Sequence, residues 1–311
     1  MLAAIAVTAV GFGLLVVASD RFVSGASRLA LRLEIPAIVV GAVVIGFGTS
    51  LPEMLTSALA AADGAREIAL GSVVGSNLAN LTLVVGVVAL LARPAITSRV
   101  LRRELPIMLA AMALLALCLP RLSRATAAVL LGAFAVAMLS TLRAARVADD
   151  PLAAVVEHEL RDEAIIPSRR LVVELVAGLA GTVAGAQLLV SGARSIADQA
   201  GLADGLVGFT LVALGTSLPE VVTGVQSARR GDADLAIGNV LGSNVFNSLV
   251  SGGIVGLLSP GTIGAGLPAS AWIGVGVGVG VAVMMTTSRQ LVRWEGFVLL
   301  AAYVATIPVV A

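Results

Sequence analysis

Long apolar runs separated by short polar breaks make up most of the chain. Residues 37–47, 81–91, 107–119 and 273–285 contain no charged side chain. A helix needs about 20 apolar residues to cross the roughly 30 Å hydrocarbon core of a bilayer. The pattern predicts ten such helices, near residues 2–30, 35–62, 67–92, 105–119, 124–144, 169–197, 202–229, 234–258, 268–286 and 291–310.

The composition agrees with a membrane environment. Of the 311 residues, 58% are hydrophobic and only 13% are charged, whereas soluble domains carry about 25% charged residues. We therefore expect an all-α polytopic membrane protein whose partners are the lipid bilayer and small ions, working as a monomer. The net charge of +1 gives no electrostatic basis for binding nucleic acid.

The chain repeats itself after 167 positions. Residues 48–53 read GTSLPE and recur letter for letter at 215–220. The same shift aligns 71–80 with 238–247, where six of the ten residues are identical. The repeats are thus 1–144 and 168–311, joined by a polar linker at 145–167. Because five helices per half is an odd number, the second half enters the membrane from the opposite side, giving two inverted five-helix repeats.

The distribution of arginine predicts the orientation. With the N-terminus outside, fifteen arginines fall on cytoplasmic ends and loops, and four fall outside: Arg66, Arg121, Arg124 and Arg194. Positively charged residues concentrate on the cytoplasmic side of membrane proteins. We therefore expect both termini outside and the linker in the cytoplasm.

Each GTSLPE copy places a helix breaker, two hydroxyls and a carboxylate inside an apolar run. Proline removes one N–H and clashes with the carbonyl one turn back. The second and seventh helices should therefore break near Gly46–Leu51 and Ala213–Leu218. Carbonyls freed at membrane depth persist only where they line a cavity or are buried in protein. Thr49 and Glu53 are four positions apart and would share a face of the resumed helix.

The helix after each motif carries a polar stripe. The stripe residues are spaced by four, so they lie on one face of a helix: Ser72, Ser76 and Asn80 in the first half, and Asn239, Ser243 and Asn247 in the second. Glycines beside them would let the broken helix approach closely: Gly71, Gly75, Gly238 and Gly242. Such groups can also simply hold helices together, but their recurrence opposite matching carboxylates favours a binding role.

Glu53 and Glu220 determine the class of ligand. An acid inside a membrane span is a functional-site candidate. If the halves pack symmetrically, the two carboxylates meet, and at ~5 Å and an effective dielectric of ~20 they repel by ~3 kcal/mol. A proton or a cation must neutralise them. The available ligands are all oxygen, which favours Ca²⁺, Na⁺ or Mg²⁺ over zinc or copper, and Ca²⁺ accepts six to eight oxygens.

The polar residues in the apolar runs favour a transporter over an enzyme. Membrane-embedded aspartyl cleavage uses two Asp that share a proton, whereas this pair is Glu, and the only histidine, His158, falls in the linker. We therefore expect no enzymatic activity and no cofactor. A purely structural protein would have no need of duplicated buried acids. Exchange of protons for Ca²⁺ stays open, because protons can neutralise the same pair.

The two GTSLPE motifs, each followed by GSN-x-x-N on the next helix, resemble the Ca²⁺/cation antiporter superfamily, and most closely its prokaryotic sodium/calcium exchangers. The likeness covers the whole chain, with paired alpha-repeats at 41–91 and 208–258. It implies an antiporter in the plasma membrane, the inner membrane of a prokaryotic-type cell. Such an antiporter moves Ca²⁺ out and Na⁺ in by alternating access, and the first helix of each half forms a mobile pair.

The resemblance also implies a ligand set. Glu53 and Glu220 would bind Ca²⁺ and share competing Na⁺ sites. The other oxygens would come from Thr49, Ser50, Thr216 and Ser217, from the backbone carbonyls of Gly46 and Ala213, and from Ser76, Ser243, Asn80 and Asn247. Several family members carry Asp at the position of Asn247, as do K⁺-dependent exchangers, so K⁺ dependence is the less expected alternative, beside H⁺/Ca²⁺ exchange on the same glutamates.

Overall fold

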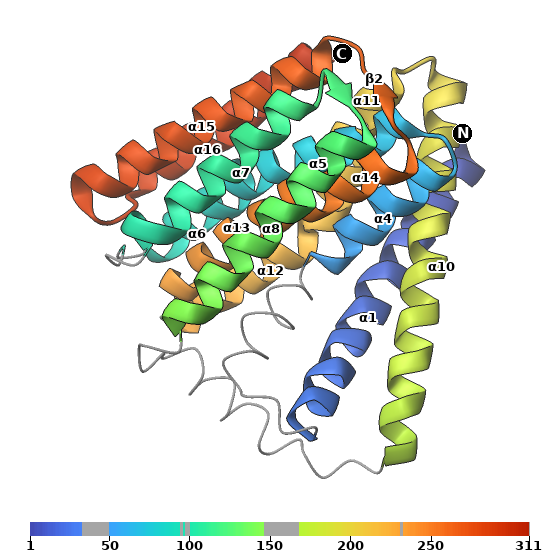
Figure 1. Ribbon diagram of the computed structural model, residues 1–311, viewed down its shortest axis with the longest axis horizontal. Helices are drawn as coiled ribbons and strands as arrows, with labels where there is room; N and C mark the ends of the chain where they lie inside the picture. The colour runs from blue at the N-terminus through green and yellow to red at the C-terminus, as the bar shows by residue number, and fades with distance from the viewer. Residues whose placement is uncertain (33–49, 94–95, 97–99, 146–167, 231–232, 311) are drawn as a thin grey trace.

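The computed structural model describes residues 1–32, 50–93, 96, 100–145, 168–230 and 233–310, and most of them are helical (Figure 1). The first half contains α1 (Leu2–Arg32), α4 (Leu51–Ala62), α5 (Arg66–Ala79), the π-helix η2 (Asn80–Val84), α6 (Val85–Ala92), the π-helix η3 (Val100–Glu104), α7 (Leu105–Cys118) and α8 (Arg124–Ala145). Of the predicted linker, only residue 145 lies among the described residues.

The second half follows the same order. It contains α10 (Ser168–Ala200), α11 (Asp204–Val207), the π-helix η4 (Gly208–Val212), α12 (Ala213–Arg230), α13 (Ala233–Phe246), the π-helix η5 (Asn247–Ser251), α14 (Gly252–Leu258), α15 (Gly266–Ser288) and α16 (Arg293–Val310). Where the chain is described, the helices begin and end within a few residues of the predicted ranges. Within these residues, seven helices are long and apolar enough to cross a membrane.

The two helices that carry the polar stripes lie at the centre of the bundle. In the most apolar 18-residue window of Arg66–Ala92 and of Ala236–Leu258, 83% of the residues are buried. The corresponding share for Arg124–Thr141 in α8 is 11%. Apolar side chains, most of them aliphatic, fill the space around them, and the largest fully buried one among the described residues is Phe209 in η4. The polar groups of the stripes are therefore held away from lipid.

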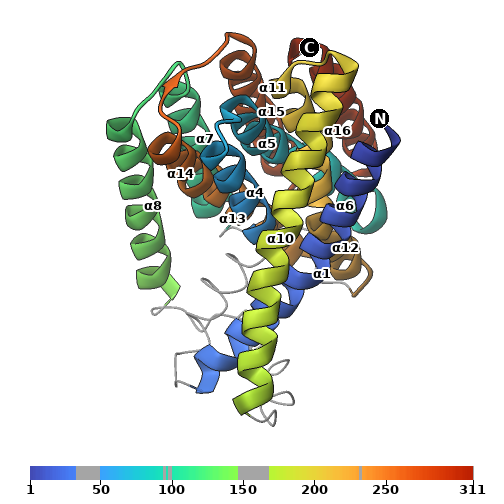
Figure 2. The same ribbon diagram turned by 90° about the vertical axis from the view of Figure 1, so that its right-hand side faces the viewer.

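The long helices α1 and α10 lie side by side along their length (Figures 1 and 2). A Cβ on Gly185 would lie 2.5 Å from the backbone nitrogen of Leu15, and one on Gly178 would lie 2.7 Å from that of Phe22. The order of these contacts shows that the two helices are antiparallel. Glycine permits such close backbone contact between helices in a membrane.

An ion pair and a small strand pair tie distant segments together. Arg28 Nη1 on α1 lies 3.0 Å from Glu174 Oε2 on α10. The strands β1 (Arg121–Leu122) and β2 (Gly261–Thr262) pair antiparallel, a feature that the apolar pattern did not predict. Both chain ends lie at the same end of the bundle (Figure 2).

The structure differs from the predicted break in the seventh helix. Residues 213–230 form one α-helix with Pro219 inside it, and the irregular π-helical turn comes earlier, at 208–212. Proline is tolerated inside membrane helices when local π adjustments and neighbouring groups satisfy the backbone. In the first half, Ser50 precedes a helix that begins at Leu51 with Pro52 in its first turn. The rest of that predicted break lies outside the described residues.

Candidate cation site

Two buried carboxylates from opposite halves form the centre of the site. Glu53, in the first turn of α4, is 0% exposed, and Glu220, within α12, is 1% exposed. The two motifs are in contact, because Ser217, three residues before Glu220 on α12, hydrogen-bonds to Glu53. Because both carboxylates are buried, bulk water cannot stabilise their negative charges. The pair therefore needs a bound proton or cation.

Most of the oxygens of this pair are free to bind such a partner. Ser217 Oγ donates a hydrogen bond of 3.4 Å to Glu53 Oε1. Glu53 Oε2 and both carboxylate oxygens of Glu220 have no hydrogen-bond partner among the described residues. Buried polar atoms are hydrogen-bonded in the large majority of cases. Three unpartnered carboxylate oxygens in one place therefore indicate a binding site for a proton or a cation.

Local sequence explains how each carboxylate is positioned. Proline is favoured at the start of a helix, where its missing N–H would have no acceptor in any case, so Pro52 suits the first turn of α4. Glu53 follows it at the positive end of the helix dipole. On α12, the hydroxyl of Thr216 donates to the carbonyl of Ala213 at 3.3 Å. That carbonyl lies in a continuous helix, and its assignment as a backbone ligand stays a prediction.

The first polar stripe, on α5, faces the GTSLPE motif of the second half, on α12. Ser76 Oγ on α5 lies 3.4 Å from Thr216 Oγ1 on α12. Ser72, Ser76 and Asn80 are all 0% exposed. Within the described chain, Ser72 Oγ and Asn80 Oδ1 have no hydrogen-bond partner, and neither has Ser50 Oγ. The structure thus brings a stripe hydroxyl of one half against the motif of the other.

Two of the three residues of the second stripe are buried, and Asn239 is half-buried. Ser243 is 1% exposed and Asn247 is 0% exposed. Neither polar atom of the Asn247 side chain has a hydrogen-bond partner in the part of the chain that the structure describes. Thr49 and Gly46 lie outside the described residues, so their predicted roles are not tested here.

Both stripes end in a feature that the sequence did not predict. The π-helices η2 and η5 begin at Asn80 and Asn247, which are equivalent under the shift of 167. Single π-helical turns inside α-helices occur frequently at functional sites. Their repetition at the two candidate amide ligands adds structural support for a site there, and the matching asparagines were the only sequence signal for it.

Close packing beside the stripes is confirmed in the first half. A Cβ on Gly71 would lie 2.5 Å from Gly205 O, and one on Gly75 would lie 2.3 Å from Phe209 O. In the second half, a Cβ on Gly242 meets nothing within 4 Å among the described residues. The second helix of the first half, the expected neighbour of Gly242, is described only from residue 50 onward.

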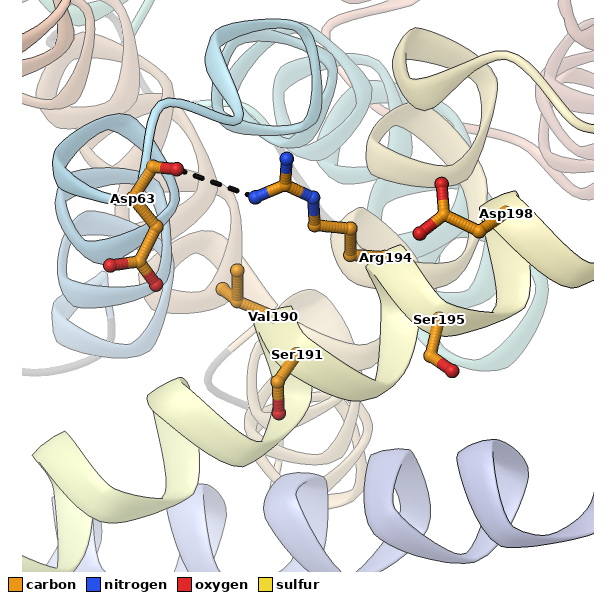
Figure 3. Close-up of a pocket in the computed structure, with 6 residues that line it drawn as sticks. All are labelled: Asp63, Val190, Ser191, Arg194, Ser195 and Asp198. Carbon is orange, nitrogen blue, oxygen red and sulfur yellow. Dashed lines mark hydrogen bonds between the residues drawn. The ribbon is translucent and has the colours of Figure 1, made fainter.

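A separate, solvent-exposed pocket lies where α10 meets the end of α4 (Figure 3). Its volume is about 460 Å³, and it is lined by Asp63, Val190, Ser191, Arg194, Ser195 and Asp198. Arg194 Nη1 donates to the backbone carbonyl of Asp63 at 3.3 Å, and Gln187 Nε2 donates to Asp63 Oδ2 at 2.9 Å. The glutamates do not line this pocket. It marks a polar contact between the α1–α10 pair and the rest of the bundle.

The fold is that of a multi-pass helical membrane protein with a cluster of buried carboxylate, hydroxyl and amide groups at its centre. Residues 3–143 and 170–310 match the model of the family described as sodium/calcium exchanger protein. The chain belongs to this family, whose members are secondary transporters rather than enzymes. The family resemblance inferred from the motifs is thereby confirmed, and the protein is a cation/Ca²⁺ antiporter.

Individual relatives agree over nearly the whole chain. The putative antiporter CaxA of Alkalimonas amylolytica is 36% identical over 98% of this chain and 97% of its own length. The sodium/calcium exchanger MaX1 of Methanosarcina acetivorans is 30% identical over 95% of each chain. A solved structure of the sodium-calcium exchanger NCX_Mj superposes with a TM-score of 0.67 at 28% identity, covering 99% of this chain and 98% of that one.

Proposed function

We propose that this protein exchanges Ca²⁺ for Na⁺ by alternating access, with both ions competing for Glu53 and Glu220. The observation that carries the proposal is the pair of buried carboxylates, three of whose four oxygens have no partner among the described residues. The names of MaX1 and NCX_Mj as sodium/calcium exchangers support Na⁺ as the counter-ion.

Charge explains why exchange would be coupled. An empty site carries two negative charges. Enclosing them away from water is unfavourable by roughly several kcal/mol per ion, as it is for other buried charges. One Ca²⁺, or Na⁺ ions in its place, cancels those charges. Only the loaded forms can then cross between the two access states, so neither ion leaks without the other.

The proposed ligand set is the one implied by the motifs. Besides the two glutamates it comprises Ser50, Thr216, Ser217, Ser76, Ser243, Asn80 and Asn247 among the described residues, with Thr49 and the carbonyls of Gly46 and Ala213. Hydroxyl, amide and carbonyl oxygens suit Ca²⁺, whose coordination is flexible. Na⁺ is also a hard cation and binds to the same kind of oxygen.

The proposed architecture is ten membrane helices in two inverted repeats, 1–144 and 168–311, joined by a cytoplasmic linker at 145–167. The antiparallel packing of α1 and α10 supports inversion, because these helices occupy equivalent positions in the two repeats. We place both termini outside an inner membrane of the prokaryotic type. A single chain contains both glutamates, so a monomer suffices for transport.

The moving part would be the pair α1–α10. Glycine contacts and the ion pair between Arg28 and Glu174 hold the two helices together as one unit. Its polar contacts with the end of α4 are the bonds from Gln187 and Arg194 to Asp63. When the pair slides, these exposed bonds must break and re-form.

Flux measurements with imposed gradients test the proposal. Purified protein in Na⁺-loaded liposomes should take up Ca²⁺ when diluted into Na⁺-free medium, with no requirement for K⁺ or a pH gradient. Uptake that is indifferent to the Na⁺ gradient would refute Na⁺/Ca²⁺ exchange. Uptake driven by a pH gradient alone would establish H⁺/Ca²⁺ exchange on the same glutamates, and an absolute need for K⁺ would establish the K⁺-dependent alternative.

A further inference from the structure

Four buried asparagines, two from each GSN-x-x-N motif, lie at the centre of the bundle, and the proposed ligand set includes only two of them. Asn80 and Asn247 are the proposed ligands. Asn77 and Asn244 are equivalent to each other under the shift of 167, and each lies one position off its polar stripe. Asn77 is 3% exposed, and the other three are 0% exposed.

A chain of hydrogen bonds joins three of these residues across the two halves. Asn80 Nδ2 donates to Asn244 Oδ1 at 3.0 Å. Asn244 Nδ2 donates to the backbone carbonyl of Asn77 at 3.1 Å. The same Nδ2 lies 3.8 Å from the sulfur of Met108 and 3.9 Å from that of Met112, both of which are weak acceptors.

The backbone carbonyl at Asn77 fixes the direction of the whole chain. A carbonyl can only accept, so Asn244 must turn its NH₂ group toward it and its oxygen toward Asn80. Asn80 must then present its own NH₂ group to that oxygen. The oxygen of Asn80 is left over, and it has no hydrogen-bond partner among the described residues. The order of donors and acceptors thus leaves a buried amide oxygen free to bind a cation.

The equivalent residues in the other half are arranged differently. Asn77 Nδ2 donates to Ser248 Oγ at 2.8 Å, and the first half has Leu81 where the second has Ser248. Asn77 Oδ1 and both polar atoms of Asn247 lack a hydrogen-bond partner in the described chain. Of the two proposed amide ligands, only Asn80 is held by the side chain of another asparagine within the described part of the chain.

We infer that Asn244 is a positioning residue, which holds Asn80 with its oxygen available to the transported cation. This inference rests on the proposed function, because it assumes that Asn80 binds the ion. Without Asn244, the amide of Asn80 can rotate and present its NH₂ group to the cation. The partial positive charge of that group would oppose binding.

A double-mutant cycle measured by equilibrium Ca²⁺ binding to the purified full-length protein tests the inference. Asn244→Leu removes the amide and keeps the volume of the side chain. We expect it to weaken Ca²⁺ binding about tenfold, which corresponds to about 1.4 kcal/mol. In an Asn80→Asp background the same substitution should change binding less than about twofold, because a carboxylate presents an oxygen whichever way it turns.

The matched control is Asn77→Leu, which removes an amide from the equivalent place and leaves the pair of Asn80 and Asn244 intact. It should weaken Ca²⁺ binding less than about threefold, although it removes the hydrogen bond to Ser248. A second variant, Asn244→Asp, still accepts from Asn80 and should retain Ca²⁺ binding. It keeps the inference testable if Asn244→Leu does not fold.

Two kinds of failure can be told apart. Equal weakening by Asn244→Leu in both backgrounds, or loss of binding in Asn244→Asp, would show that Asn244 acts only on the fold and would overturn the positioning role. If the unmodified protein binds no Ca²⁺, the proposed function itself is wrong, and this inference falls with it.

Discussion

Glu53 and Glu220 end the same six-residue motif, yet their surroundings differ. Pro52 lies in the first turn of a helix, whereas Pro219 lies inside one. Glu53 accepts a hydrogen bond from Ser217 of the other motif, while Glu220 has no partner among the described residues.

This contrast bears on the mechanism. Two inverted repeats with the same motif can exchange roles, and a transporter built from them must be asymmetric in any single state, because one side is open while the other is closed. Because the two motifs have the same sequence, the two repeats can adopt two equivalent conformations with their roles exchanged. The structure shows one of these conformations. The proposed function therefore predicts which residues matter equally in both halves and which matter in only one.

The largest effect is expected at the acids, which should matter equally. Glu53→Gln and Glu220→Gln each remove one of two charges that bind the cation, and either should reduce Na⁺-driven Ca²⁺ uptake into liposomes more than about 100-fold, since one lost charge–cation contact is worth several kcal/mol in a low dielectric. Both variants should remain folded, as judged by their elution from a sizing column.

Glu295→Gln is the matched control for these variants. Glu295 is also a buried acid, 4% exposed, but it accepts from the backbone nitrogen of Val292 at the start of α16. A glutamine oxygen can accept the same bond, so uptake should stay within about twofold of the unmodified rate. Normal transport by either Glu53→Gln or Glu220→Gln would contradict the site.

An intermediate effect is expected where a packed glycine is filled. A Cβ added in Gly75→Ala would collide with Phe209 O and Ala213 Cβ on the neighbouring helix, and overpacking of this kind lowers the free energy of unfolding by about 1–3 kcal/mol. The control is Gly132→Ala on the exposed face of α8, where a Cβ meets nothing within 4 Å among the described residues, so stability should be nearly unchanged. Thermal unfolding of the two variants in detergent measures the difference, and equal melting temperatures would contradict the close packing at Gly75.

The smallest effect is expected where α10 meets α4. Gln187→Leu removes the exposed hydrogen bond to Asp63, which is worth about 0.5–1.5 kcal/mol. The maximal uptake rate should change less than about tenfold, and the Ca²⁺ concentration for half-maximal uptake should not change. A large rise in that concentration would mean that this pocket is part of the cation site.

Much of the fold could be predicted from the sequence because lipid imposes a simple rule on it. Runs such as 107–119 and 273–285 have to be helices, and helices are found there. The continuous helix through Pro219 could not be predicted, because the π-helical turn at 208–212 that precedes it has no local signature. The strand pair at Arg121 and Thr262 depends equally on contacts between segments far apart in the sequence.

The candidate site was predictable in its charges and less so in its geometry. Glu53 and Glu220 are conspicuous as duplicated acids in apolar runs. Asn244 belongs to the GSN-x-x-N motif, but its role could not be predicted because it lies off the stripe of Ser243 and Asn247. Its proposed role depends on the backbone carbonyl of Asn77 in the other half. This contact between the two repeats cannot be predicted from the sequence of either repeat alone.

Equilibrium binding of radioactive Ca²⁺ to the purified protein, titrated with Na⁺, tests the central claim most directly. If both ions share the pair of glutamates, Na⁺ should displace the bound Ca²⁺ completely, with a dependence steeper than first order because a single Na⁺ cannot replace two charges. Glu53→Gln and Glu220→Gln should bind Ca²⁺ far more weakly. Ca²⁺ that stays bound at saturating Na⁺, or binds normally to both variants, would contradict the account.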